Sequence, residues 1–330
     1  MSQDSLQTVT GAIHPDALGK TLMHEHLLIG YPGAEVDGVN PGPGAEERVT
    51  RCVDRIEELK GLGFTSLLDP CPSDLGRDVE LMAKVAQKTG FQIVCATGLY
   101  KQEEGGYPYW HMRQAFGPTV DAMAEIFIRD ITEGIGSTGV RAGIIKVATG
   151  PGGMTDYERG IFEAAAKASV ETGAPITTHT DQGSVGDLQQ QVLTEHGVLA
   201  HRIVIGHSCG TSDHDYHMKI ARGGSYLGFD RFGLDMIQPD EERVSSLAQL
   251  IAAGAGDRAV VSHDSVWCWR GQPFPPAVEQ AVAPNWNPTH FSLRIIPKLK
   301  ERGVSDAQID ALLVDNPRRF FAGEKLATLS

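Results

Sequence analysis

The sequence predicts an α/β fold, namely a (β/α)8 TIM barrel. Short apolar segments with the length of strands alternate with helical segments about eight times along the 330 residues. These segments are apolar almost throughout, which is typical of parallel strands buried on both faces. Histidine, lysine and aspartate recur at the ends of several of them, where a barrel gathers its functional side chains.

The first third of the chain begins with a cap and then starts the alternation. Turn-forming Gly and Pro in 6–20 predict a small N-terminal cap, and the apolar run 21–29 predicts the first strand. The elements expected next are a helix that ends at Gly61, a strand at 64–69, a helix that ends at Gly90, a strand at 91–97 and a long aromatic loop at 99–118. Each helix carries apolar residues at helical spacing and ends at a glycine.

The rest of the chain repeats the strand–helix unit. After a helix at 120–134, the expected strands are 141–148, 175–179, 202–207, 225–230 and 258–264, and the expected helices are 157–172, 185–196, 213–222, 241–254, 290–302 and 306–321. We therefore expect a single barrel domain over residues 1–330, in which 303–330 form a C-terminal helical extension. The alternative, a doubly wound open sheet, is disfavoured because no Gly-x-Gly-x-x-Gly turn follows the first strand.

The composition argues against several classes of function. The chain has 29 Lys and Arg against 42 Asp and Glu, a formal net charge of −13, which would repel a nucleic acid. No segment approaches the ~20 unbroken apolar residues of a membrane helix, and no secretion signal is evident. The five cysteines are scattered without a Cys-x-x-Cys pair, which argues against a zinc ribbon or a disulfide framework. We therefore expect a cytoplasmic protein that binds neither nucleic acid nor a membrane.

Two histidines in the first strand suggest a metal site. His24 and His26 are one residue apart, so both side chains point to the same face of an extended strand, whereas Glu25 points to the other. Imidazole is a common ligand of divalent transition metals. The pair alone is weak evidence, because a strand end can present two histidines by chance.

Further residues of suitable chemistry stand at the ends of later strands. They are Lys146, His179, His207 and Asp264. Each one alone has an ordinary interpretation, for example as a hydrogen-bonded polar residue or, for Asp264, as a turn former. Because the carboxyl ends of barrel strands meet at one mouth, we expect all of them to converge there with His24 and His26.

Lys146 is unusual because it lies within an apolar strand, where an unpaired ammonium is costly and its pKa falls. A neutral lysine could form a Schiff base with a carbonyl substrate, or it could add carbon dioxide and become a carbamate that bridges two metal ions. The histidines and Asp264 favour the carbamate, since a Schiff-base enzyme does not need them. The other alternative is a lysine whose ammonium reaches out of the barrel into water.

The motifs around these residues resemble those of a known family. They are LGKTLMHEH at 18–26, IKVA at 145–148, THT at 178–180, IGH at 205–207, GFDRFG at 228–233, SHD at 262–264 and DNPRRFF at 315–321. In order and spacing the chain resembles the phosphotriesterase family of the amidohydrolase superfamily, and specifically its phosphotriesterase-like lactonases. The resemblance covers nearly the whole chain.

The resemblance implies a binuclear metal centre. By it, the buried metal ion is held by His24, His26 and Asp264, the exposed one by His179 and His207, and both are bridged by N6-carboxylated Lys146 and a hydroxide. Zinc is the first expectation, with cobalt, iron or manganese as alternatives. Tyr100 resembles the tyrosine that lies over the metals in the lactonases, and Arg231 resembles their pocket arginine.

The chain departs from the family pattern at Gly210. The family usually has an acidic residue there, three positions after the sixth-strand histidine. A proton relay from Asp264 through that acid is therefore in question, with Asp213 or solvent as the substitutes.

These features predict a hydrolase that opens lactone rings, with N-acyl-homoserine lactones as the leading substrates and a role in quorum quenching. The metal-bridging hydroxide would attack the carbonyl, and Asp264 would act as general base and acid. The seventh loop is short, and the eighth is long and rich in Trp, Phe and Pro, as in the lactonases. Such a wall suits an alkyl chain, although it could also be a packing loop or a dimer contact.

Other functions remain as alternatives. Weak phosphotriesterase activity is expected beside the lactonase activity, and a true phosphotriesterase could use the same site as its main activity. A Schiff-base lyase centred on Lys146 and a metal-dependent binding protein without catalysis are more remote. Since relatives are commonly homodimers, we expect a homodimer.

Overall fold

The computed structural model describes residues 5–329, and its core is an eight-stranded parallel sheet curled into a nearly closed barrel. The strands, in chain order, are β3 (Lys20–Leu22), β5 (Phe64–Asp69), β6 (Gln92–Gly98), β7 (Ile144–Lys146), β8 (Ile176–Thr177), β9 (Ile203–Ile205), β10 (Tyr226–Phe229) and β11 (Ala259–Val261). Strands adjacent in this order are adjacent and parallel in the sheet. The predicted (β/α)8 barrel is confirmed.

The barrel closes between its first and last strands. The amide of Met23 donates to the carbonyl of Val261 at 3.2 Å, and the amide of His24 donates to the hydroxyl of Ser262 at 2.9 Å. Just past this closure two short strands, β4 (Glu25–His26) and β12 (Ser265–Val266), pair in parallel. The expected first strand over 21–29 is therefore two pieces, because β3 pairs with β5 whereas β4 pairs with β12.

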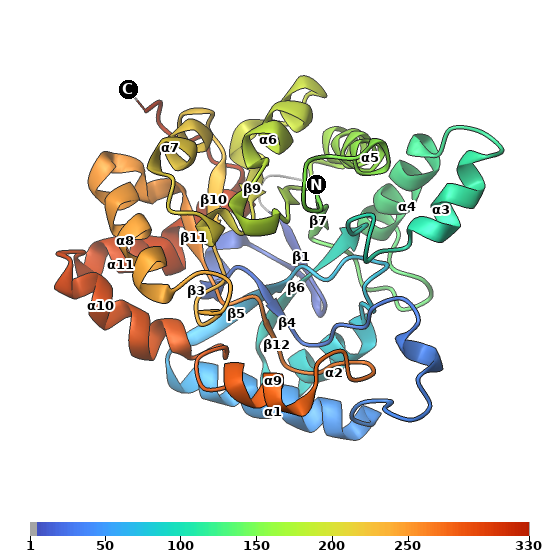
Figure 1. Cartoon of the computed structure of the whole chain (residues 1–330), viewed down its shortest axis with the longest axis horizontal. Helices are drawn as coiled ribbons and strands as arrows, with labels where there is room; N and C mark the ends of the chain where they lie inside the picture. Colours follow the sequence, from blue (N-terminus) through green and yellow to red (C-terminus); the bar gives the residue numbers. More distant parts are fainter. Residues whose placement is uncertain (1–4, 330) are drawn as a thin grey trace.

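Helices surround the strands, as Figure 1 shows. Those that alternate with the strands are α1 (Ala45–Gly61), α2 (Val79–Thr89), α4 (Val120–Thr132), α5 (Asp156–Thr172), α6 (Gly186–Glu195), α7 (His214–Arg222) and α8 (Asp240–Leu250). After β11 follow a π-helical turn (Phe291–Ile295), α10 (Ile296–Glu301), α11 (Asp306–Asp310), a second π-helical turn (Ala311–Asp315) and α12 (Asn316–Ala322). No helix among residues 5–329 is long and apolar enough to cross a membrane.

Two helices lie where the sequence predicts only loops. They are α3 (Tyr107–Gln114), within the aromatic loop 99–118, and α9 (Pro276–Val282), within the eighth loop. Both are short, so they show too few repeats for apolar periodicity to reveal them. Each has a proline in its first turn, where the missing amide costs no helical hydrogen bond.

The barrel interior is an apolar floor beneath the polar strand ends. Val94, Ile144, Val204 and Val260, from four strands, are almost fully buried in one cluster. Ile144 and Lys146 are two residues apart in β7, so they share the inward face of the strand. Lys146 therefore stands at the end of a strand whose inward face is otherwise apolar.

Residues 6–20 lie near the opposite end of the barrel from Lys146. They form a hairpin of β1 (Leu6–Thr8) and β2 (Gly11–Ile13), followed by a short 3-10 turn at Pro15–Ala17. The amide of Val9 donates to the carbonyl of Ile93, near the start of β6, at 2.9 Å. The division of the chain into cap, single barrel domain and extension stays a prediction.

Candidate functional site

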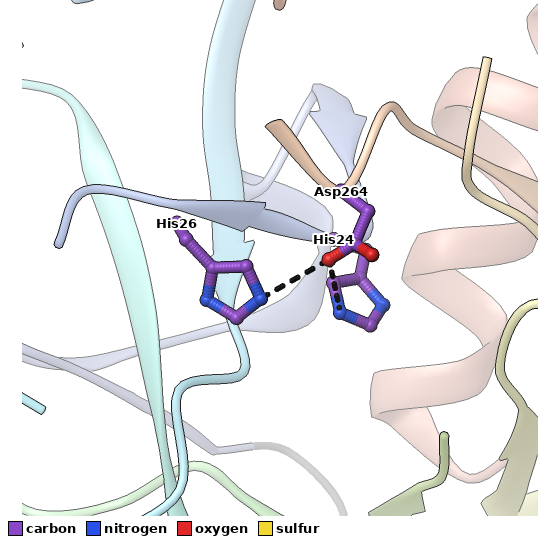
Figure 2. A group of neighbouring side chains, drawn as sticks. All are labelled: His24, His26 and Asp264. Carbon is purple, nitrogen blue, oxygen red and sulfur yellow. Dashed lines mark ion pairs between the residues drawn. The ribbon is translucent and has the colours of Figure 1, made fainter. Parts of the chain in front are cut away.

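Three of the candidate ligands share one point at the mouth of the barrel. Nε2 of His24 and Nε2 of His26 each lie 3.3 Å from Oδ1 of Asp264. Figure 2 shows the two rings turned toward that one carboxylate. The histidines converge because they are two residues apart at β4. Asp264, which meets them, has a left-handed backbone with φ of 54°, a conformation that non-glycine residues seldom adopt.

The remaining candidate ligands surround this group. Nζ of Lys146 lies 3.2 Å from Nε2 of His24, and Nε2 of His207 lies 3.7 Å from Oδ2 of Asp264. The ring of His179 packs edge-on against that of His207, with centroids 4.6 Å apart. The structure thus places the four histidines, the lysine and the aspartate in one cluster, as their positions at strand ends predict.

A layer of acidic side chains orients the histidines. Asp230 binds Nδ1 of His24 at 3.2 Å and Nδ1 of His207 at 2.8 Å, and Asp69 binds Nδ1 of His26 at 3.3 Å. A carboxylate on one ring nitrogen leaves the lone pair of the other nitrogen directed at the centre. Neither Asp69 nor Asp230 is among the residues predicted from the sequence, although both stand at strand ends like the proposed ligands.

In His179 the carboxylate lies at Nε2 rather than at Nδ1. Its Nε2 lies 3.3 Å from Oδ1 of Asp181, and its Nδ1 lies 3.2 Å from the hydroxyl of Tyr100. Nδ1 is therefore the nitrogen that this histidine would offer to a metal, on the side of the site where Tyr100 lies. Asp181 is likewise not among the residues predicted from the sequence.

The protonation of the site suits metal ligation. Burial lowers the pKa of His207 to about 3 and the pKa of His179 well below its usual value, so both imidazoles keep a lone pair. Burial also lowers the pKa of Lys146 to about 8, which makes the neutral amine accessible. Burial alone would raise the pKa of Asp264, but His207, His24 and Arg231 hold it well below its usual value.

His26 differs from the other histidines. Burial alone would lower its pKa, but hydrogen bonds with Asp264 and Asp69 raise it well above the usual value. The protonated His26 ring then lies between the carboxylates of Asp264 and Asp69, and its Nε2 proton takes the position that a metal ion would occupy. Metal binding would release that proton.

The residues present fit a pair of divalent metal ions. Nε2 of His207 is buried and has no hydrogen-bond partner among the described residues. Leaving a buried polar atom unpaired costs free energy, and a bound metal ion would remove that cost. His24, His26 and Asp264 place three ligand atoms within 4.8 Å of one another. Imidazole nitrogen with carboxylate oxygen is a donor set for zinc and related ions.

A cavity of about 330 Å³ opens over this cluster. One wall is apolar and aromatic, and its residues from the eighth loop and α9 are Val266, Trp269, Phe274, Val278, Val282 and Trp286. Tyr31, Tyr100 and Arg231 also line it, and Nε of Arg231 donates to Oδ2 of Asp264 at 2.9 Å. The prolines of the eighth loop and Trp267, which the sequence groups with this wall, do not line the cavity.

The structure explains the glycine at position 210. A Cβ atom there would lie 2.6 Å from the amide nitrogen of Gly183, so no larger residue fits this backbone approach. Asp213 does not replace the missing acid, since it is exposed and its carboxylate caps α7 through the amide of Tyr216. The charged partner of Asp264 is instead Arg231.

The chain is similar to known proteins over nearly its whole length. The profile of the phosphotriesterase family matches residues 4–321. A phosphotriesterase homology protein of Mycobacterium tuberculosis is 39% identical over 96% of this chain and 97% of its own. An aryldialkylphosphatase of Saccharolobus solfataricus is 34% identical over 94% of this chain and 97% of its own.

Solved structures are similar over the same length. The organophosphorus hydrolase of Deinococcus radiodurans is 40% identical, with 97% of each chain covered and a TM-score of 0.93. A structure described as organophosphate hydrolysis engineered from a weak promiscuous lactonase template is 39% identical, covering 96% of this chain and 99% of its own, with a TM-score of 0.92.

Proposed function

The chain belongs to the phosphotriesterase family and is a hydrolase of ester bonds; we propose that it opens lactone rings, with N-acyl-homoserine lactones as the leading substrates. The observation that supports this most is the aromatic wall over the ligand cluster. If the lactone carbonyl lies over the ligand cluster, its alkyl chain would contact Trp269, Phe274 and Val278, which line the same cavity. Cleavage of such lactones would make the protein a quorum-quenching enzyme.

The proposed cofactor is a pair of divalent metal ions, zinc first among them, with cobalt, iron and manganese as alternatives. His24, His26 and Asp264 would hold one ion and His179 and His207 the other, with N6-carboxylated Lys146 shared between them. When bound, the ions would polarise the ester carbonyl and lower the pKa of a water, so that the water can attack as hydroxide near neutral pH. The lowered pKa of Lys146 supports its carboxylation, because only the neutral amine adds carbon dioxide.

The side chains of the site have separate tasks in this mechanism. Asp264 takes the proton of the attacking water on a carboxylate oxygen and passes it to the alkoxide that leaves, which is general base and then general acid catalysis. Arg231 holds Oδ2 of Asp264 at 2.9 Å and so fixes the direction of that transfer. Tyr100, whose hydroxyl lies 3.2 Å from His179, orients the lactone over the centre.

The second candidate is a phosphotriesterase, because similar proteins are named aryldialkylphosphatase and organophosphorus hydrolase. The same residues could serve attack at phosphorus. The test is a comparison of kcat/KM on a panel of acyl-homoserine lactones and on paraoxon with the metal-loaded protein. We expect kcat/KM to be higher on the lactones, and turnover of paraoxon alone would contradict the lactonase proposal.

A Schiff-base lyase remains a remote alternative. In that mechanism borohydride with a carbonyl substrate would trap a covalent adduct on Lys146, and a chelator would leave activity intact. We expect no adduct and loss of activity with the chelator, since Lys146 lies 3.2 Å from a histidine of the proposed centre.

We also propose a cytoplasmic homodimer. The support is a group of exposed apolar side chains on and beside α3, namely Tyr109, Met112 and Phe116, which are 62%, 65% and 86% exposed. Such a group is a candidate contact between subunits. Sedimentation of the purified protein distinguishes the dimer from a monomer.

A further inference from the structure

Glu25 stands between the two proposed ligands His24 and His26 but faces away from the cluster. Its carboxylate is fully buried. Oε1 accepts from the hydroxyl of Ser262 at 2.8 Å, from the amide of His263 at 2.9 Å and from Nδ1 of His263 at 2.6 Å. Oε2 accepts from the hydroxyl of Ser265. Every donor on this carboxylate therefore comes from the segment 262–265, which carries Asp264.

The ring of His263 can only donate to Glu25. The amide of Phe291 donates to Nε2 of His263 at 2.9 Å, so Nε2 bears the lone pair and Nδ1 bears the proton. Four donors therefore meet the carboxylate of Glu25, three at Oε1 and one at Oε2. A buried carboxylate is stable only when it is satisfied in this way.

The backbone supplies the other links between these two segments. The amide of Asp264 donates to the carbonyl of His24 at 2.9 Å, and β4 pairs with β12 with Glu25 opposite Ser265. The hydroxyl of Ser262 also accepts the amide of His24, so it joins Glu25 to the backbone of a ligand. These hydrogen bonds hold the backbone of Asp264 in the left-handed conformation, which is strained for a residue other than glycine.

We propose that Glu25 is a positioning residue, which clamps the segment 262–265 to β4 and so fixes Asp264 between His24 and His26. The ligands point to one face of β4 and the clamp lies on the other, so Glu25 sets their geometry without contacting a metal or a substrate. The inference rests on the proposed metal centre but not on the identity of the lactone.

The test compares Glu25→Leu with Glu25→Gln in the full-length protein. Leucine keeps the approximate volume but accepts no hydrogen bond, whereas glutamine keeps an acceptor oxygen for Ser262 and His263. Each variant is loaded with Co²⁺, and four quantities are measured: the cobalt affinity by competition with a chelator, the visible absorption spectrum of the bound cobalt, and kcat and KM on a lactone.

We expect Glu25→Leu to lose about 10- to 100-fold in metal affinity or in kcat, with an altered cobalt spectrum. Glu25→Gln should restore both to within about threefold, because the acceptor is back. Wild-type cobalt affinity, spectrum and kcat in Glu25→Leu would overturn the proposal. Equal losses in both variants would overturn it as well, because they would show that the hydrogen bonds are not what matters.

A matched control is Glu158→Leu. Glu158 is also fully buried, and its carboxylate accepts the amides of Gly150 and Thr155, each at 2.9 Å, in the loop that leads into α5, and the amide of Gln102 at 3.2 Å. Its loss should lower the melting temperature without changing the cobalt spectrum. An identical spectral change in Glu158→Leu would reduce the role of Glu25 to general stability and overturn the proposal.

Two further measurements cover misfolding and failure of the metal proposal itself. If Glu25→Leu does not fold, Ser262→Ala removes one donor to Glu25 and also the acceptor of the His24 amide, and a wild-type cobalt spectrum in that variant would overturn the proposal. A wild-type protein that binds no cobalt would refute the metal centre, and with it the proposed function, whatever the variants do. Normal wild-type metal binding with unaffected Glu25 variants would refute the clamp alone.

Discussion

The ligand cluster and the cavity wall above it are built in opposite ways. The proposed ligands are almost all buried, and each histidine is held by a carboxylate, with Tyr100 as a second partner for His179. The wall comes from the eighth loop and α9, and the rim of the same cavity includes Met236 of the seventh loop, which is 71% exposed. Ligands must be held to within about half an ångström, whereas an alkyl chain accepts many wall shapes. We therefore expect the proposed centre to fix the reaction and the wall to select the substrate.

The sharpest test of the centre is Asp264→Asn. Asparagine keeps an oxygen near His24 and His26 but cannot take a proton from water. We expect kcat to fall by about 10²–10⁴-fold while metal content stays near that of the wild type. Kinetics with parallel metal analysis check this result. Turnover within tenfold of the wild type would remove Asp264 from proton transfer, and loss of turnover with intact metal content would exclude a protein that only binds.

The acidic layer behind the ligands should matter less than Asp264 but more than the wall. Asp230→Asn weakens the orientation of His24 and His207, and we expect a loss of about 10- to 100-fold in metal affinity or activity. Competition with a chelator measures the affinity. Asp213→Asn is the control, because Asp213 caps α7 outside the cavity, and it should leave the affinity unchanged.

The pH dependence of metal binding tests the raised pKa of His26. Below that pKa a metal must displace the proton, so affinity should fall as pH falls, by roughly tenfold per pH unit for one proton. Chelator competition at several pH values between 6 and 8 checks this. A flat profile would contradict a protonated His26. Asp69→Asn removes one of the hydrogen bonds that raise the pKa of His26, so metal affinity should depend less steeply on pH in this variant.

The smallest effect is expected at the wall. Trp269 stacks on Tyr31 and meets Phe274 edge-on, with ring centroids 6.2 Å and 5.2 Å apart. Trp269→Ala should raise KM by roughly 3- to 10-fold for a long-chain lactone, because each buried methylene contributes about 0.8 kcal/mol. A short-chain lactone is the control and should change little in KM or kcat. Equal changes for both chain lengths would show that the wall acts on the centre and not on the chain.

The sequence by itself determined the barrel and the convergence of the proposed ligands at its mouth. Apolar strands in regular alternation have one compact solution, and in that solution the ends of all strands meet. His24 and His26 share a face for the same reason that any residues two apart in a strand do. These are properties of short segments, so a single sequence carries them.

Only the tertiary structure decided how the ligands are held. Asp230 binds His24 across 206 residues of sequence, and Glu25 binds His263 across 238. Such bonds depend on how the ends of separate strands register, and this is set by packing throughout the barrel. The sequence places Glu25 on the far face of its strand, but its partners in the segment 262–265 became visible only once the barrel closed.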